Sequence, residues 1–580
     1  MATDTPAGEE CQRRACATDM MTSPNDSQHT LQGQEDVIIH EPIQERYDNT
    51  SAIKFRRVAS KTVVSFGPDD PSNPVNWSEK TKLFILVAGM MQVMNSTIGS
   101  SLPSGAISYI AKDFNITNQE KLVLPISVFL IGYVVGPLLW GPLSESYGRK
   151  RPMLVTFILF NIFTLACAVA RTFTSFLIFR LFNGVMASAP IAIVGGVYAD
   201  IHNDPTKRGR TMAYYMACTT FGPVVGPWVS GFISVVSWRW SFWIGLICGG
   251  LTLPLVVFLP ETYAPVILQR RAKMLRKETG NKSIVAPLDL ENRDLKQALI
   301  VTLTRPMRMI IYESIVSFTC LYLALAYAIF YLFFQAYPII FQGIYGMSAG
   351  VAGLCFLPIG AGAFIACGIF LWYDSFLARA KARGAKWSEL EECRRLPLAC
   401  VGGPLYVVSL FWIGWSASTN IHWAVPMVSG VIFGIGFMLI FMAMLNYLSD
   451  AYETFAASAQ SASSCCRSIF GAVLPLAAKP MFNNLGVHWA CSLLAFMSLG
   501  LSIIPFAFIR YGDRIRQNSK FCQQLRQLKE AERQMHEQDA LDGIRRDIEK
   551  APVSTAKPNA DASTPISPAA DKDLEKQVGA

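Results

Sequence analysis

Two basic side chains lie inside long apolar stretches, where a charge is costly. Arg180 is the one charged residue between positions 173 and 197, and Arg467 is the one between 457 and 478. At the centre of a bilayer a charged side chain costs about 2.5–3.5 kcal/mol on insertion scales, so it faces a cavity or a partner. Each arginine could bond to backbone carbonyls, and Arg467 could instead bind an anionic group of a solute. Asn183 follows Arg180 by nearly one helical turn and belongs to the same candidate site.

Polar and aromatic side chains also occur within the apolar stretches. An apolar pocket with aromatic walls and a few hydrogen-bonding groups suits bulky amphipathic molecules. Tyrosines also gather at membrane boundaries, and we expect that placement for Tyr337. The other side chains predict a central substrate cavity, lined by Gln92, Asn95, Tyr327, Tyr331 and Gln335.

Acidic residues that could carry a proton are few. Glu313, Asp200 and Asp450 all lie next to the basic loops, where capping of a helix explains them equally well. The six histidines are scattered, and the 14 cysteines show no metal-binding or redox spacing. We therefore expect no metal, no cofactor and no enzyme activity.

A short turn between two apolar stretches is rich in glycine and basic residues. It reads Gly141-Pro-Leu-Ser-Glu145-Ser-Tyr-Gly148-Arg149-Lys150-Arg151. Gly141 and Gly148 would let two helices approach closely. Glu145 would cap a helix N-terminus or pair with the basic cluster and hold one conformation. We predict a gating loop, made of Gly141, Glu145, Gly148, Arg149, Lys150 and Arg151.

A second motif combines two prolines with small residues inside one apolar stretch. It contains Gly222, Pro223, Gly226 and Pro227. Proline removes backbone hydrogen bonds and bends a helix, while glycine opens a smooth face for a neighbour. We predict that this segment is a pivot between two groups of helices; a kinked structural helix is the alternative.

The elements that would position these residues are about twelve apolar stretches, each near the 20 residues that cross a bilayer. The chain is 52% hydrophobic and 16% charged, which is poor in charge for a soluble protein. We predict an all-α membrane protein with two bundles of six helices. The expected spans are 83–105, 121–141, 152–171, 173–197, 211–234 and 239–260, then 309–335, 348–372, 397–416, 422–446, 457–479 and 485–510.

The distribution of lysine and arginine predicts the orientation. Basic residues crowd the alternate loops and both tails, within a net charge of +9, and short basic loops stay in the cytoplasm. Because topology explains these charges, we expect no nucleic-acid partner. We expect a disordered cytoplasmic tail over 1–78, bundles over 79–262 and 309–511, a cytoplasmic loop over 263–308 and a cytoplasmic tail over 512–580. Asn115 fits a glycosylation acceptor in an outer loop.

The turn between 141 and 152 resembles the signature loop of the major facilitator superfamily. That family usually has Asp at the position of Glu145 and Arg at that of Ser146. The resemblance implies two six-helix bundles with alternating access and a role for Arg180 in proton coupling. The segment from Gly222 to Pro227 is similar to the antiporter motif of drug:proton antiporters. Further segments resemble the fungal twelve-span branch: 69–78, 238–240, 260–265, 337–338, 395–397, 446–447 and 458–459.

This resemblance implies efflux of small amphipathic compounds, namely drugs, fungicides or fungal secondary metabolites. We expect protons as the coupling ion, a multi-pass protein of the plasma membrane surrounded by lipids, and a functional monomer. An exporter of organic acids is the nearest alternative, because Arg180 and Arg467 would favour carboxylates. A transport-dead nutrient sensor is the alternative from another class.

Overall fold

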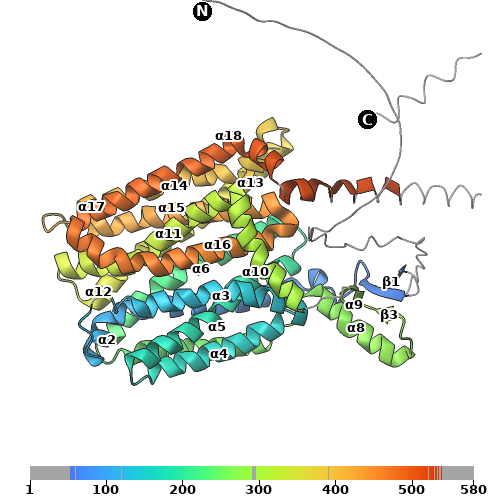
Figure 1. Cartoon of the computed structure of the whole chain (residues 1–580), viewed down its shortest axis with the longest axis horizontal. Coiled ribbons are helices and arrows are strands. Elements are labelled where there is room, and N and C mark those ends of the chain that lie inside the picture. The colour runs from blue at the N-terminus through green and yellow to red at the C-terminus, as the bar shows by residue number, and fades with distance from the viewer. Residues whose placement is uncertain are drawn as a thin grey trace, which may run out of the picture.

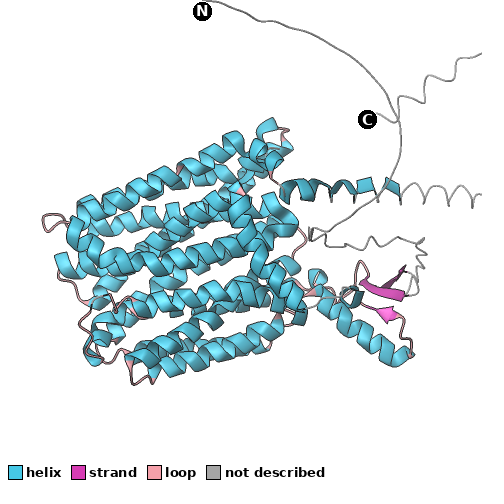
Figure 2. Cartoon of the chain, in the orientation of Figure 1, coloured by secondary structure: helices cyan, strands magenta, loops and turns pink. Residues whose placement is uncertain are grey.

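Long helices build almost all of the protein, as the computed structural model shows (Figure 1). The structure describes residues 53–58, 61–118, 120–290, 295–388, 391–519, 521–527, 529–531, 533–534 and 537–538. Most of the helices run roughly parallel to one another (Figures 1 and 2). Among the described residues, ten helical stretches are long and apolar enough to cross a bilayer. The prediction of an all-α membrane protein is therefore confirmed.

The first bundle holds six long helices and two short ones at the loop after the first. α1 begins after Ser78, whose hydroxyl accepts a hydrogen bond from the Thr81 N–H and so caps the helix. α6 is not among the ten stretches, because the threonines, glycines and prolines of its uncharged part, residues 211–233, lower its mean hydropathy. The helices are α1 (Glu79–Ser101), η2 (Ser104–Ala106), α2 (Ile107–Asp113), α3 (Leu124–Tyr147), α4 (Lys150–Ala168), α5 (Phe173–Asp200), α6 (Pro205–Ile233) and α7 (Arg239–Val257).

The second bundle repeats this plan with more broken helices. One apolar stretch, Ala456–Gly512, contains α16 and α17 and crosses twice. With α6, the ten stretches therefore correspond to twelve crossings. The helices are α11 (Ser314–Tyr337), η3 (Pro338–Ile344), α12 (Ala349–Leu354), α13 (Leu357–Ala382), η4 (Lys386–Ser388), α14 (Glu391–Ser416), α15 (Ala424–Tyr452), η5 (Glu453–Phe455), α16 (Ala456–Val473), η6 (Leu474–Ala477), α17 (Ala478–Leu501) and α18 (Ile503–Asn518).

A small lobe projects from one end of the bundles, which we call the α8 end (Figure 2). It contains α8 (Ala264–Thr279), α9 (Pro287–Leu290) and a three-stranded sheet. Antiparallel β1 (Ile53–Val58) pairs with β2 (Lys61–Phe66), and β2 pairs in parallel with β3 (Ile284–Val285). The expectation of disorder throughout 1–78 is thus wrong for the two strands, residues 53–58 and 61–66. Val64 and Phe66 of β2 lie two residues apart, so they share one face of the strand, and this face packs with Leu268 and Ala272 of α8.

Ion pairs fasten the lobe together. Asp70 is buried and binds Arg271 of α8, which ties the segment before α1 to the segment after α7. Asp289 of α9 binds Arg276 of α8 at 2.7 Å and accepts a bond from Gln269 at 2.9 Å. Burial alone would raise the pKa of the Asp289 carboxyl, but these bonds and that of the Ala286 N–H hold the pKa below its ordinary value.

The two bundles meet along α6 and α3. α6 packs on α12 and α13 of the second bundle, and α3 packs on α16. α10 (Leu295–Tyr312) lies at the α8 end and contacts both α3 and α16. It runs across the direction of the long helices (Figure 1). The helices that carry the predicted pivot, cavity and gating loop therefore all reach the boundary between bundles or the α8 end.

Candidate transport site and its gates

The turn between α3 and α4 is held by an acidic residue from outside the predicted loop. Glu261 is 7% exposed and lies just before α8. Its carboxylate accepts hydrogen bonds from the backbone N–H groups of Arg149 at 2.7 Å and Lys150 at 3.3 Å. These groups begin α4, so Glu261 supplies the negative charge that a helix N-terminus favours. Arg270 of α8 adds a cation 3.8 Å from the same carboxylate.

Glu145 does not have the predicted contacts. Within the described part of the chain, no hydrogen bond or ion pair involves its side chain. The expectation that it caps a helix or pairs with the basic cluster is wrong in this conformation, because the turn places Glu261 over the start of α4. A clue to Glu261 was available, since it is the first acid after the sixth expected span.

The glycines of the turn differ in their roles. Gly148 has φ +91°, and a Cβ there would lie 2.3 Å from a carboxylate oxygen of Glu261. Only glycine combines that backbone conformation with so close an approach. Gly141 has open space where a Cβ would lie, so the predicted close helix contact at this residue is wrong.

The side chain of Arg149 joins the turn to α5. It binds Asp200 at 3.3 Å and donates to the Ser144 hydroxyl at 2.7 Å. Its guanidinium also lies over the ring of Tyr263, 4.8 Å from the centroid. The basic turn, the end of α5 and the start of α8 therefore form one polar cluster, which we call the latch: Ser144, Arg149, Asp200, Glu261, Tyr263 and Arg270. Arg151 is exposed outside it.

Arg180 is fully enclosed in the first bundle. Its three guanidinium nitrogens donate to carbonyls of Pro125 at 2.9 Å, Gly99 at 2.8 Å and Ser100 at 3.2 Å. The guanidinium also lies 4.3 Å from the centroid of Phe129, a cation–π contact. These bonds to backbone carbonyls are the packing arrangement that the sequence left open, and the role of Arg180 in coupling stays a prediction.

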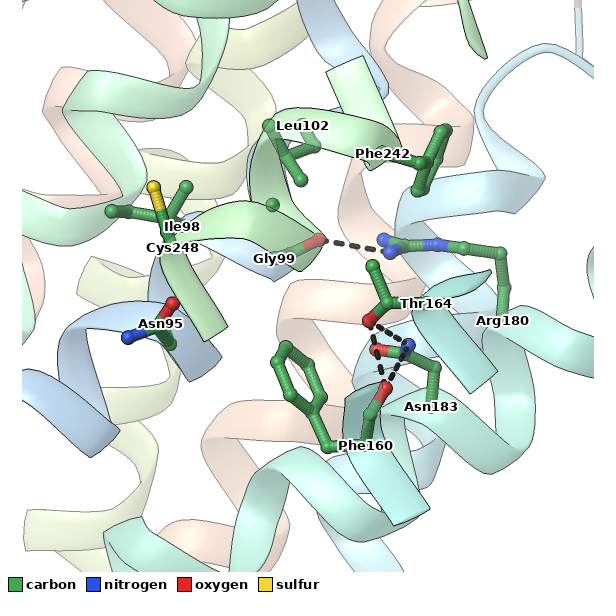
Figure 3. Close-up of a pocket in the computed structure, with 11 residues that line it drawn as sticks. Asn95, Ile98, Gly99, Leu102, Phe160, Thr164, Arg180, Asn183, Phe242 and Cys248 are labelled. Atoms are coloured by element: carbon green, nitrogen blue, oxygen red, sulfur yellow. Dashed lines mark hydrogen bonds between the residues drawn. The ribbon is translucent and has the colours of Figure 1, made fainter. Parts of the chain in front are cut away.

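Arg180 and Asn183 border a small cavity inside the first bundle (Figure 3). The Asn183 amide donates to Thr164 at 2.8 Å and to the Phe160 carbonyl at 3.2 Å, which ties α5 to α4. The oxygen of the same amide has no partner among the described residues. Cys248 and Asn95 lie across the cavity in Figure 3.

Gln92 and Asn95 face this interior and not the boundary between bundles. Gln92 donates to the Met153 carbonyl of α4 at 2.9 Å, and Asn95 donates to Thr252 of α7 at 2.8 Å. Both partners belong to the first bundle, so the expected place of these two side chains in a central cavity is wrong for this conformation. The residue of α1 that reaches the other bundle is Ser100, which the sequence analysis missed.

A short polar path crosses between the bundles at Ser100. Its hydroxyl shares a hydrogen bond of 2.9 Å with the Tyr331 hydroxyl of α11. The hydroxyl of Tyr327 donates to that of Tyr331 at 3.4 Å. The guanidinium of Arg467 on α16 lies 5.9 Å from the centroid of the Tyr327 ring. Thus the structure brings together three predicted residues, Tyr327, Tyr331 and Arg467, at the boundary between bundles.

Arg467 is not neutralised by an acid there. Its one bond to another described side chain goes to the Ser464 hydroxyl at 3.3 Å, and no described carboxylate lies within ion-pair distance. The charge therefore lies beside the Tyr327 ring without a described carboxylate to neutralise it. Further along α11, Gln335 is 4% exposed and its amide nitrogen has no described partner.

Tyr337 is completely buried, so its expected place in a boundary belt is wrong. Its ring stacks on Phe356 at 4.3 Å between centroids. It lies within a run of aromatic residues that fills the second bundle. The sequence shows only that Tyr337 is near the end of an apolar stretch, and this does not tell whether its side chain points into the bundle or lies at the membrane boundary.

The three candidate proton carriers all lie at the α8 end and have partners. Asp200 binds Arg149, and Asp450 binds Arg395 at 3.0 Å. Glu313 is 2% exposed and accepts hydrogen bonds from the Tyr452 hydroxyl at 2.9 Å and the Phe521 N–H at 3.4 Å. Glu313 therefore anchors the segment after α18 in this conformation, and its role in coupling remains a prediction.

The glycines of the α6 motif lie in tight contacts. A Cβ at Gly222 would meet the Thr97 hydroxyl at 1.9 Å, and one at Gly226 would meet the Ser101 hydroxyl at 1.9 Å. The carbonyl of Pro227 lies 2.6 Å from where a Cβ of Gly353 would be. α6 is therefore pressed between α1 of its own bundle and α12 of the other, with no room for added side chains.

Asn115 lies on an exposed loop after α2, at the end of the bundle opposite the lobe, with a positive φ of 53°. Its use as a glycosylation site stays a prediction.

The profile of the Major Facilitator Superfamily matches residues 86–475, more than half of the chain. The chain belongs to the major facilitator superfamily. The transporter oryN of Aspergillus oryzae is 39% identical over 78% of this chain and 89% of its own length. The efflux pump FUB11 of Gibberella moniliformis is 37% identical over 82% and 81%. The multidrug transporter mdrA of Aspergillus fumigatus is 35% identical over 78% and 75%. These relatives confirm the resemblance to fungal transporters of the superfamily.

The superfamily fold is also found by comparison with solved structures. The proton:xylose symporter XylE aligns with a TM-score of 0.56 over 75% of this chain and 97% of its own, at 16% identity. At that identity the likeness shows the fold alone. Membership makes this chain a multi-pass transporter of small molecules, and the path at Ser100, Tyr331, Tyr327 and Arg467 lies where its two bundles meet.

Proposed function

We propose that this transporter exports small amphipathic compounds by alternating access. The observation that supports this most is the α6 motif, whose glycines allow direct backbone contact with α1 and whose Pro227 carbonyl faces α12. At the boundary between bundles the Pro227 carbonyl lies against Gly353, where a small residue lets the two helices approach closely. Relatives that cover most of the chain are named efflux pumps and multidrug transporters.

In this proposal the substrate binds beside Tyr327, Tyr331 and Arg467. The hydrogen bond between Ser100 and Tyr331 must break when the bundles separate at that level, because its two hydroxyls belong to different bundles. The latch keeps the first bundle and α8 moving as one body, since Glu261 and Arg149 bind across three elements. Gln335 would join the site only after a rearrangement of α11.

We propose that transport is coupled to protons by antiport and that Arg180 takes part in this coupling. Arg180 is held by backbone carbonyls, and no carboxylate of the described residues neutralises its charge, so it should respond strongly to any acid that approaches it. We also propose the plasma membrane as location, with the α8 end in the cytoplasm because its loops are basic, and a monomer as the working unit.

The test is uptake into membrane vesicles against an imposed pH gradient, over a panel of neutral drugs and organic acids. Antiport predicts accumulation that follows the gradient and collapses when an ionophore removes it. Uptake of a panel compound that ignores the gradient would overturn the proton as coupling ion.

Export of organic acids is the second candidate, favoured by the unneutralised charge of Arg467 beside Tyr327. Arg467→Gln separates the two candidates: it should abolish transport of acids and leave neutral compounds nearly unchanged. Equal loss for both classes would speak against a carboxylate site.

A further inference from the structure

α10 has an apolar face that is largely exposed in the described chain. α10 exposes four large apolar side chains at intervals of three and four residues, which places them on a single face. Their exposed fractions are 59% for Ile300, 41% for Leu303, 56% for Met307 and 69% for Ile311. Single exposed apolar residues are ordinary, but a continuous stripe on one helix calls for a partner.

The opposite face of α10 packs on the protein. Met309 is completely buried, and the Arg305 guanidinium lies 5.2 Å from the centroid of the Phe455 ring. α10 also contacts α3 and α16, so it bridges the two bundles. The stripe is therefore the outer face of a helix that is fixed in place, and not the face of a loosely attached segment.

The position of α10 indicates what covers the stripe. It ends at Tyr312, and the membrane helix α11 begins at Ser314, after a single extended residue. Phe318, on the first turns of α11, is 49% exposed and continues the apolar surface toward the membrane. Figure 1 shows α10 running across the long helices, as a helix in the plane of a bilayer surface would. Lipid chains are thus within reach of the stripe.

A charge on the edge of the stripe selects the kind of lipid. Arg308 is exposed one position after Met307, and no described carboxylate lies within ion-pair distance of it. An amphipathic helix with apolar residues on one side and basic residues beside them lies in the headgroup region and is drawn to anionic lipids. One basic residue near such a surface contributes about 1 kcal/mol.

We propose that α10 is an interfacial helix that binds anionic phospholipid in the leaflet at the α8 end. Its stripe inserts between acyl chains, and Arg308 binds the headgroup. Because α10 contacts both α3 and α16, the lipid that occupies it bears on the boundary along which the bundles rock. This inference does not depend on which compound the protein transports.

The test uses the full chain in vesicles of phosphatidylcholine with phosphatidylserine, in roughly a four-to-one mixture that imitates an anionic leaflet. A trace of phosphatidylserine or phosphatidylcholine carries a photoreactive group on its acyl chain, and labelled peptides are identified by mass spectrometry. We expect both probes to label the peptide that contains Met307, with phosphatidylserine favoured. Arg308→Gln should lower labelling by phosphatidylserine about fivefold and leave phosphatidylcholine unchanged.

Matched variants on α8 act as controls. Met274 is 60% exposed, slightly more than Met307 at 56%, and Lys277 is exposed like Arg308, but both lie on the helix that projects away from the bundles. Met307→Asp should reduce labelling of α10 by both lipids, whereas Met274→Asp should not. Lys277→Gln should leave the preference for phosphatidylserine intact.

The peptide that contains Phe318 is the internal standard for folding. If Met307→Asp lowers labelling there as well, Met307→Ser replaces it and should still reduce labelling of α10 selectively. Absence of label on α10 with either lipid would mean that protein covers the stripe, and it would overturn the proposal. The proposal would also be overturned if Arg308→Gln lowered labelling by the two lipids equally. It would be overturned as well if Lys277→Gln lowered labelling by phosphatidylserine as much as Arg308→Gln does.

Discussion

Neutralising Glu261 should release the turn that begins α4, whereas neutralising Glu145 should not. The Glu261 carboxylate accepts three backbone N–H groups, from Arg149 at 2.7 Å, Tyr263 at 3.1 Å and Lys150 at 3.3 Å, and faces Arg270 at 3.8 Å. Hydrogen bonds to a charged group contribute about 1.5–3 kcal/mol each, and a charge at a helix N-terminus adds about 0.3–1 kcal/mol.

The amide of Glu261→Gln keeps one oxygen for the N–H groups of Arg149 and Tyr263 but turns an N–H₂ group toward the N–H of Lys150 and toward Arg270. We therefore expect the free energy of unfolding to fall by about 1.5–3 kcal/mol, which corresponds to one hydrogen bond to a charged group and part of the interaction with the helix N-terminus. Such a loss raises the unfolded fraction roughly 10- to 150-fold. Glu145→Gln removes the same charge from the same turn and should change stability by less than about 0.5 kcal/mol, the range of ordinary surface substitutions.

The assay is unfolding of the purified transporter in mixed micelles of increasing denaturing detergent, with wild type and both variants in parallel. Efflux from intact cells, normalised to protein at the membrane, gives the functional counterpart, and we expect Glu261→Gln to transport less. If Glu145→Gln lost as much stability as Glu261→Gln, the assignment of the capping acid would be refuted. A stable Glu261→Gln would refute the magnitudes as well.

Three further results are expected. Gly226→Leu should abolish efflux, because even a Cβ would lie 1.9 Å from the Ser101 hydroxyl, while Gly250→Leu, where a Cβ meets nothing, should leave efflux kinetics unchanged. Arg180→Ala should abolish transport although the protein reaches the membrane, since it deprives three carbonyls of their donor, each at about 1–3 kcal/mol; full activity would contradict a role in coupling. Asn115→Gln should remove a glycan and increase mobility on gels, and an unchanged mobility would show that the site is unused.

The sequence predicted the helices well because the bilayer sets their length and polarity. The spans could be placed from apolar runs alone, since each must satisfy its own backbone in lipid. The sequence was less informative about contacts between segments that are far apart in the chain. Glu145 and Glu261 are both acids beside basic turns, and only the folded chain decides which carboxylate reaches the N–H groups of Arg149 and Lys150.

The sequence also predicted poorly the direction in which the polar side chains of a helix point. Polar side chains of α1 are spaced so that successive ones face different neighbours, and the sequence cannot say which neighbour belongs to which bundle. Gln92 and Asn95 bond to α4 and α7, while Ser100, further along the same helix, bonds to α11. The assumption that polar residues of the first span face the centre therefore selected Gln92 and Asn95 instead of Ser100.

Ser100 also relates the two intramembrane cations to the boundary between bundles. Its carbonyl accepts from Arg180 and its hydroxyl bonds to Tyr331, so one residue contacts both the buried charge and the opposite bundle. When the bundles separate there, the hydroxyl loses its partner while the carbonyl stays bonded within the first bundle. Arg180 can therefore respond to the movement through α1 and, by its bond to Pro125, through α3, whereas Arg467 lies on the second bundle and would meet the substrate at the proposed site. Arg180 is enclosed in the first bundle, whereas Arg467 lies at the boundary between bundles. Variants of Arg180 should therefore affect coupling, and variants of Arg467 should affect substrate binding.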